Sequence, residues 1–140
     1  MTAVAYAVSY IARASRELPS FSMAHWFLRL PLAAIIMQQG FSKFPLAADE
    51  AASYGLPLIL WSSAAIGEFA AGAALIAGGA FRNWAGELIT RAAGLAIAAI
   101  VAGVLMVAYW APPLDILLYN QFHVLLLVGG IYFALRGNRA

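Results

Sequence analysis

The sequence predicts an all-α integral membrane protein, in which a four-helix transmembrane bundle follows an amphipathic helix at the membrane interface. Of its 140 residues, 64% are hydrophobic and only 10% are charged, whereas about 25% are charged in a typical soluble domain. Four apolar stretches are long enough to cross a bilayer at about 1.5 Å per residue. Lys and Arg are also distributed unevenly between the connecting segments, which orients the bundle.

The same composition excludes several classes of function. The chain has no cysteine, so disulfides, thiol redox chemistry and Cys-ligated zinc or iron–sulfur sites are excluded. Its net charge of +2 is small and dispersed, whereas binding to nucleic acid requires clustered Lys and Arg. The expected partner is therefore the lipid bilayer, not a nucleic acid.

Residues 1–20 are predicted to form the amphipathic segment. On a helical wheel the apolar stripe consists of Val4, Val8, Ile11 and Leu18, and the opposite face of Ser9, Arg13, Arg16 and Glu17. This pattern is typical of a helix that lies in the membrane interface, and a frayed terminus is the alternative. No positive charge precedes the apolar part, which argues against a signal peptide.

Residues 21–140 are predicted to form the bundle. Its four spans are expected at about 23–44, 58–80, 88–110 and 114–135. Short connections make consecutive spans antiparallel neighbours. The longest connection, residues 45–57, is polar and has room for one short helix. Small residues predict tight seams between the spans; they include Gly78, Gly94, Gly103, Gly129 and Gly130.

The positive residues predict the orientation. One side of the four-span arrangement is flanked by Arg13, Arg16, Arg82, Arg136 and Arg139. The other side is flanked by Lys43, together with the acids Asp49, Glu50 and Asp115. Because positive residues stay in the cytoplasm, both termini are expected there. The predicted location is the cytoplasmic (inner) membrane, which the chain crosses several times.

Glu68 is the single ionisable residue of the second span. A carboxylate near the middle of a bilayer costs at least about 2.5–3.5 kcal/mol, so it requires a partner. One interpretation is a buried ion pair with Arg29, Arg91 or Lys43, which would hold the bundle in register. The other is a functional carboxylate that carries a proton or binds a ligand. The sequence leaves both open, and with them the question of enzymatic activity.

Other polar residues lie at depth and are candidates for a ligand site. The full set of candidate ligand-binding residues is Arg29, Gln39, Lys43, Glu68, Arg91, Gln121 and His123. Gln39 and Lys43 are four residues apart and therefore share a helix face. His25 is expected at the opposite end of the bundle from His123, so the two are not expected to bind one metal or haem, and no metal site is predicted.

A quinone requires fewer protein ligands from such a site than a metal or haem does. Its carbonyl groups require one hydrogen-bond donor at the rim of an apolar slot, and Lys43 or His123 would serve. The aromatic candidates for the walls of the slot are Phe41, Phe44, Tyr54, Trp61, Phe69 and Tyr109. The structural alternative is that these aromatic residues contact lipid or anchor the helices.

Three motifs resemble the DoxX family of small four-helix membrane proteins. They are Arg29 followed by Gly40-Phe41-Ser42-Lys43, then Gly67-Glu68-Phe69-Ala70-Ala71-Gly72, then Arg91-Ala92-Ala93-Gly94. The resemblance covers most of residues 25–137, but the N-terminal segment has no counterpart in it. It implies an association with membrane redox complexes that reduce quinone. Carried over by position, Arg29, Lys43 and Glu68 match the polar residues of the family.

These observations favour one function and leave two others. The favoured function is a subunit of a redox or energy-converting membrane complex that binds quinone in the bundle, with Glu68 as proton carrier. The first alternative is a structural or assembly subunit without chemistry. The second is a small transporter, which with four spans per chain would need a homo-oligomer.

Overall fold

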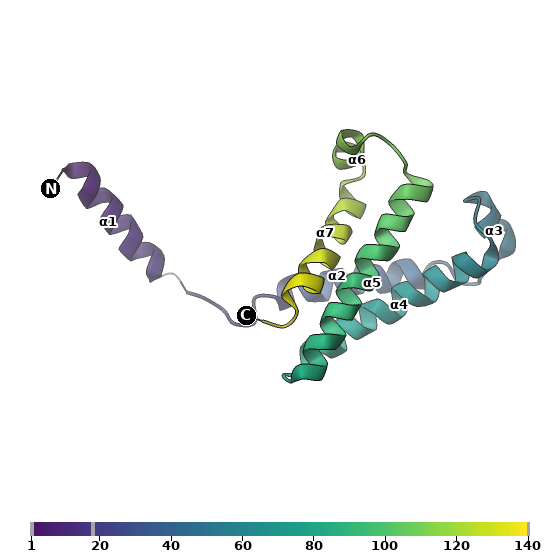
Figure 1. Ribbon diagram of the computed structural model, residues 1–140, viewed down its shortest axis with the longest axis horizontal. Coiled ribbons are helices and arrows are strands. Elements are labelled where there is room, and N and C mark those ends of the chain that lie inside the picture. Colours follow the sequence, from purple (N-terminus) through teal and green to yellow (C-terminus); the bar gives the residue numbers. More distant parts are fainter. Residues whose placement is uncertain (1, 18, 140) are drawn as a thin grey trace.

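The computed structural model describes residues 2–17 and 19–139, and all secondary structure in these ranges is helical. Leu18, predicted on the apolar stripe, and the terminal residues Met1 and Ala140 lie outside the described residues. The helices are α1 (Ala3–Arg16), α2 (Trp26–Phe41), α3 (Ala48–Ser53), α4 (Leu58–Ala80), α5 (Trp84–Ala108), α6 (Pro113–Tyr119) and α7 (Gln121–Arg136) (Figure 1).

Helix α1 stands apart from the other helices (Figure 1). It begins after Thr2, whose hydroxyl accepts a hydrogen bond from the amide of Ala5 at 3.4 Å. All its residues are exposed, and Arg13 and Arg16 occupy its last turn. A helix therefore forms over the predicted amphipathic segment, and its place in the membrane interface stays a prediction.

Two helices are long and apolar enough to cross a membrane: α4 with 23 residues and α5 with 25. Helices α6 and α7 make a third candidate if they count as one span, although they meet at a bend of 102°. Helix α4 matches the second predicted span at both ends. Helix α5 begins four residues earlier than predicted, because Asn83 caps it by accepting a hydrogen bond from the amide of Gly86 at 3.0 Å.

The predicted fourth span, 114–135, is wrong as one continuous helix. Helix α6 ends at Tyr119, and Asn120 takes φ −119° and ψ 38°, outside the helical region, before α7 begins. Asparagine favours such breaks because its side chain competes for backbone hydrogen bonds. The first predicted span, 23–44, is also too long: α2 has 16 residues, or about 24 Å, against about 30 Å of bilayer hydrocarbon.

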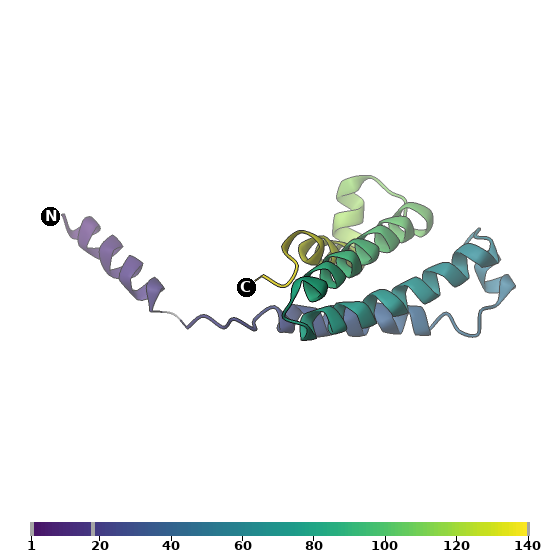
Figure 2. The ribbon, with the colours of Figure 1, turned by 60° about the horizontal axis from the view of Figure 1, so that its bottom comes forward.

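The long helices pack as antiparallel neighbours, α2 with α4, α4 with α5 and α5 with α7. The α2–α4 pair and the α5–α7 pair meet near the turn between α4 and α5 and diverge toward α3 and α6 (Figures 1 and 2). Here the end near Arg29, Thr90 and Asn138 is named the closed end, and the end near α3 and α6 the open end. Helices α2 and α7 make only a small contact, in which Leu32 packs against Gly129.

Glycines permit the close approach of α5 and α7. A Cβ atom on Gly94 would lie 2.5 Å from the amide nitrogen of Ala134 and 2.6 Å from the carbonyl oxygen of Gly130. The seams predicted at Gly94 and Gly130 are therefore confirmed. The seam predicted at Gly103 is wrong, because no atom of the described residues lies within 4 Å of a Cβ atom placed there. Gly103 faces open space instead.

Gly94 and Gly103, both on α5, give a matched test of packing. We expect Gly94→Ala to destabilise the protein by about 1–3 kcal/mol, because overpacking forces the α5 and α7 backbones apart. Gly103→Ala has room for its methyl group, and we expect it to be neutral or to stabilise by up to about 1 kcal/mol through helix propensity. Unfolding in detergent micelles measures both. Equal effects of the two substitutions would contradict this description of the seam.

Candidate functional site

A cavity of about 350 Å³ lies between the two helix pairs toward the open end. All four long helices contribute to its walls, and residues of α3 and the loop after it complete them. Most of the lining is apolar, including Ile36, Val101 and Leu126. The polar and aromatic lining residues are Gln39, Ser42, Lys43, Glu50, Tyr54, Trp61, Glu68, Tyr109 and His123.

The central polar feature of the cavity is an ion pair between α4 and the segment after α2. The Nζ atom of Lys43 lies 2.6 Å from Oε2 of Glu68, and the two side chains are only 13% and 4% exposed. Lys43 also donates to the carbonyl oxygen of Gln39 at 3.1 Å. Each charge thus has a partner, as burial requires. Of the three partners considered from the sequence, Glu68 pairs with Lys43.

Gly40 explains why Lys43 reaches Glu68. It lies one turn before Lys43, and a Cβ atom there would be 2.5 Å from the carbonyl oxygen of Ala65 and 3.1 Å from Cβ of Glu68. Only a residue without a side chain lets α2 approach α4 this closely. The G-x-x-K spacing therefore combines a close helix contact with a cation placed one turn beyond it.

Aromatic rings surround the ion pair. The ring of Trp61 lies 5.5 Å from Nζ of Lys43, within range of a cation–π interaction. Tyr54 stacks on Trp61 with a centroid distance of 5.1 Å, and Tyr109 lies 4.7 Å from the ring of His123. Trp61 is 6% exposed, and within the described residues its Nε1 atom is buried without a hydrogen-bond partner. Trp61 thus lines the cavity and has a donor with no partner among the described residues.

Arg29 lies outside the cavity, at the closed end, and is fully buried. Its Nη1 atom donates to the carbonyl oxygen of Leu75 at 2.5 Å and to Oγ1 of Thr90 at 3.1 Å. Its Nη2 atom donates to Oδ1 of Asn138 at 2.6 Å, and the guanidinium lies 4.7 Å from the ring centre of Phe133. Arg29 therefore joins α2 to α4, α5 and the C-terminal segment.

Asn138 completes this network, and sequence reasoning missed it. Its Nδ2 atom donates to the carbonyl oxygen of Gly78 at 2.7 Å, and its backbone amide donates to Glu87 at 2.8 Å. Gly137, with a φ of 66°, turns the chain after α7 so that Asn138 can enter the network. The signal in the sequence that could have indicated Asn138 is the Gly137-Asn138 pair directly after the last helix.

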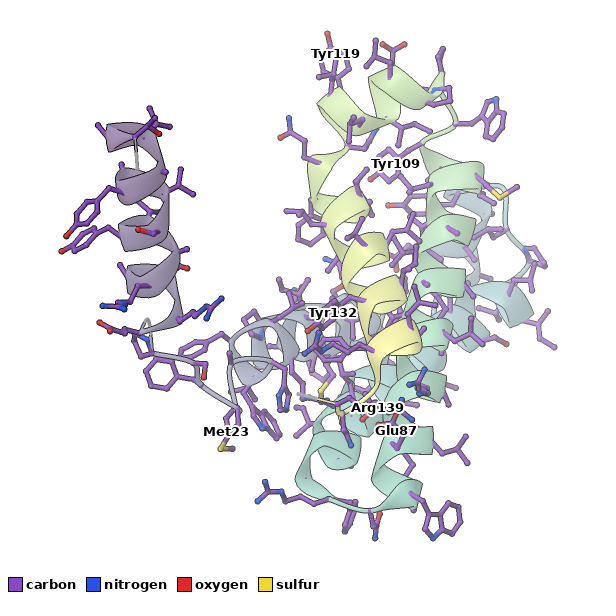
Figure 3. All side chains as sticks on the ribbon, turned by 60° about the vertical axis from the view of Figure 1, so that its left-hand side comes forward. Met23, Glu87, Tyr109, Tyr119, Tyr132 and Arg139 are labelled. Atoms are coloured by element: carbon purple, nitrogen blue, oxygen red, sulfur yellow. The ribbon has the colours of Figure 1, made fainter. Side chains whose placement is uncertain are left out.

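Arg91 also has a structural position. Its Nε atom lies 2.7 Å from Oε1 of Glu87, and its guanidinium donates to the carbonyl oxygens of Ala134 and Leu135 near the end of α7. A cation suits this position because the last carbonyls of a helix lack partners within the helix. Arg139 reaches the same carboxylate of Glu87 at 3.8 Å (Figure 3).

The structure therefore divides the residues proposed from the sequence. Gln39, Lys43, Glu68 and His123 meet at the cavity, whereas Arg29 and Arg91 lie at the closed end. Gln121 is exposed and bonds locally to the carbonyl oxygen of Leu118.

Two lining residues, Ser42 and Glu50, were missed as site residues. Ser42 follows the last turn of α2, and Glu50 lies on the short helix α3, within a connection that the sequence predicted only as polar. Of the six aromatic candidates, Tyr54, Trp61 and Tyr109 line the cavity, whereas Phe41, Phe44 and Phe69 do not.

Comparisons of the chain with protein-family models, curated proteins and solved structures gave no match. Its class therefore follows from the helices and the cavity: a helical membrane protein with an ion pair inside an apolar, aromatic-walled cavity. Over the described residues, no group of three or more His, Asp or Glu side chains is placed to hold a metal ion.

The ion pair predicts that removing the positive charge alone destabilises the protein more than removing both charges. We expect Lys43→Met to destabilise the protein by about 3–5 kcal/mol, because it leaves Glu68 buried without a counter-charge. Adding Glu68→Gln removes that charge, and we expect the double variant to regain most of the loss. Unfolding of the wild type, both single variants and the double variant in detergent gives the coupling energy. Additive effects would contradict the pairing.

Proposed function

We propose that this chain is a DoxX-like four-helix membrane protein that binds a quinone in its cavity, as a subunit of a redox or energy-converting complex. The observation that supports this most is the combination of donors inside one apolar space. Lys43 and Trp61 both line it, and within the described residues Nε1 of Trp61 is buried without a hydrogen-bond partner. A buried donor without a partner favours a ligand that brings an acceptor, and a quinone brings carbonyl oxygens on a flat ring.

The cavity suits such a ligand in size and character. Its volume of about 350 Å³ falls at the lower end of the range for small-molecule sites, about 300–1,000 Å³. Its walls combine apolar side chains with the rings of Tyr54, Trp61 and Tyr109, and flat rings pack well against aromatic faces. A transporter or a purely structural subunit does not require this arrangement.

The roles of the residues follow from their chemistry. When bound, a quinone supplies two-electron, two-proton redox chemistry, and the protein supplies binding, orientation and electrostatics. Lys43, Trp61 and His123 would donate hydrogen bonds to its oxygen atoms. Glu68, which shares a hydrogen bond with Lys43, would hold and release a proton at Oε2. Electrons would come from a partner protein of the complex.

Quinone binding is tested by removing the proton carrier. We expect Glu68→Gln to keep the fold and to weaken quinone binding about tenfold or more, because Lys43, the proposed donor to the quinone, loses the carboxylate that holds it in the cavity. The measurement is quenching of tryptophan fluorescence by quinone titrated into the protein in detergent. Asp115→Asn on α6, which is exposed and does not line the cavity, is the matched control. A folded Glu68→Gln variant with unchanged affinity would sink the proposal.

We further propose that the closed end faces the cytoplasm, with both termini there. The arginines support this orientation: Arg82 lies in the turn between α4 and α5, and Arg136 and Arg139 follow α7 toward the same end. Lys43 is the one described cation near the other end of the long helices, with the acids of α3 and α6. This asymmetry agrees with the preference of positive residues for the cytoplasm.

Reporter fusions test this orientation. We expect a fluorescent protein fused after Ala140 to fluoresce, because it folds in the cytoplasm, and alkaline phosphatase fused there to be inactive. Alkaline phosphatase fused after Ala111, in the segment between α5 and α6, is the control and is expected to be active. Phosphatase activity at the C-terminus would overturn the orientation.

A further inference from the structure

One strip of α5 belongs both to the cavity and to the outer surface of the protein. Ala99, Gly103 and Val107 are exposed, and all three line the cavity. They are spaced four residues apart and therefore form one line along the helix. The cavity is consequently continuous with the outside of the protein along this line.

The strip is open because its residues are small and the neighbouring helix diverges. No atom of the described residues lies within 4 Å of a Cβ atom placed on Gly103. Three residues nearer the closed end, Ile100 still reaches toward Gly67 of α4. A Cβ atom placed on Gly67 would lie 3.2 Å from Cδ1 of Ile100. Helices α4 and α5 separate progressively beyond that contact (Figure 2).

The surroundings of this opening identify what lies outside it. Helix α5 is apolar from Ala92 to its end and is one of the two helices that are long and apolar enough to cross a membrane. Exposed side chains of such a helix face lipid chains rather than water. Val107 is 54% exposed, and Leu95 on the same helix is 64% exposed. Large apolar side chains this exposed are typical of a surface that faces lipid. The opening therefore leads into the hydrocarbon region of the bilayer.

The inner end of the opening is polar. The ion pair of Lys43 and Glu68 lines the same cavity, and so does Trp61. A molecule that fits both parts has a polar head group with acceptor atoms and a long hydrocarbon chain. The water-facing end is narrowed by α3, whose Ala51 is fully buried and whose neighbour Tyr54 stacks on Trp61.

We propose that the cavity is entered sideways from the bilayer, through a lateral opening between α4 and α5 along Ala99, Gly103 and Val107. The occupant of this opening is the hydrocarbon chain of the ligand, which stays in it while the head group reaches Lys43 and Glu68. This inference rests on the proposed quinone site and specifies its substrate class as quinones with a long prenyl chain. A small, water-soluble quinone would lack the contacts of the chain.

The opening itself is tested without any quinone. The chain has four tryptophans, and replacing Trp26, Trp84 and Trp110 with Phe leaves Trp61 as the single fluorophore. In vesicles of phosphatidylcholine brominated on its acyl chains, we expect strong quenching of Trp61 relative to ordinary phosphatidylcholine, although Trp61 is 6% exposed. Adding Gly103→Leu fills the opening and should lower the quenching at least twofold.

Ala92→Leu is the matched control, since Ala92 is exposed on α5 but lies outside the cavity. We expect it to leave the quenching of Trp61 unchanged. Quenching that is absent, or that Gly103→Leu and Ala92→Leu change equally, would overturn the lateral opening. Thermal unfolding of each variant shows whether it remains folded, and Gly103→Ala replaces Gly103→Leu if the larger side chain does not fold.

A second measurement separates this inference from the proposed function. We expect Gly103→Leu to weaken binding of a prenylated benzoquinone about tenfold or more and to leave binding of its chain-free analogue unchanged. Equal effects on both would overturn the role of the opening while leaving the quinone site in place. If neither compound binds the wild type, the proposed function fails, and the quenching of Trp61 alone decides whether the cavity opens to lipid.

Discussion

The constraint on which this structure depends is the cost of placing charge inside an apolar helical protein. An unpaired buried charge costs several kcal/mol, so each one determines which helices must meet. Arg29 meets this constraint at the closed end, where the backbone of α4, Thr90 of α5 and Asn138 after α7 accept its hydrogen bonds. Glu68 meets it nearer the open end through Lys43. Both polar centres involve α4, but they have different consequences.

The difference lies in how completely each centre is enclosed. Around Arg29, two adjacent glycines of α4 lack the side chains that would hold the helices apart. A Cβ atom on Gly78 would lie under 3 Å from Thr90, and one on Gly79 under 3 Å from Arg29. The closed end is therefore filled by protein alone. Around Lys43 and Glu68 the helix pairs have already diverged, and aromatic rings and small residues border a cavity. The divergence of two well-packed pairs thus leaves a cavity between them, while each pair stays packed.

A membrane environment gives the open geometry its function. In water, an exposed apolar line of residues beside a cavity would favour association or collapse. In a bilayer the same line faces hydrocarbon, and the cavity gains an entrance for molecules that already lie in the membrane. One path then leads from the lipid along the small residues of α5 to Trp61 and to the ion pair of Lys43 and Glu68. This arrangement favours a lipid-soluble ligand over a solute from either aqueous side.

The sequence alone determined the class of the protein, the limits of α4, and the requirement that Glu68 have a partner, because apolar length and the cost of buried charge are local properties. It also indicated Gln39, Lys43 and His123 as neighbours of a site. It did not separate these residues from Arg29 and Arg91, nor indicate the bend at Asn120, the network of Asn138 or the open side of Gly103. These features depend on the angle between the helix pairs and on where the chain after Gly137 packs against α4 and α5. Such relations arise between residues far apart in the chain, and only the tertiary structure decides them.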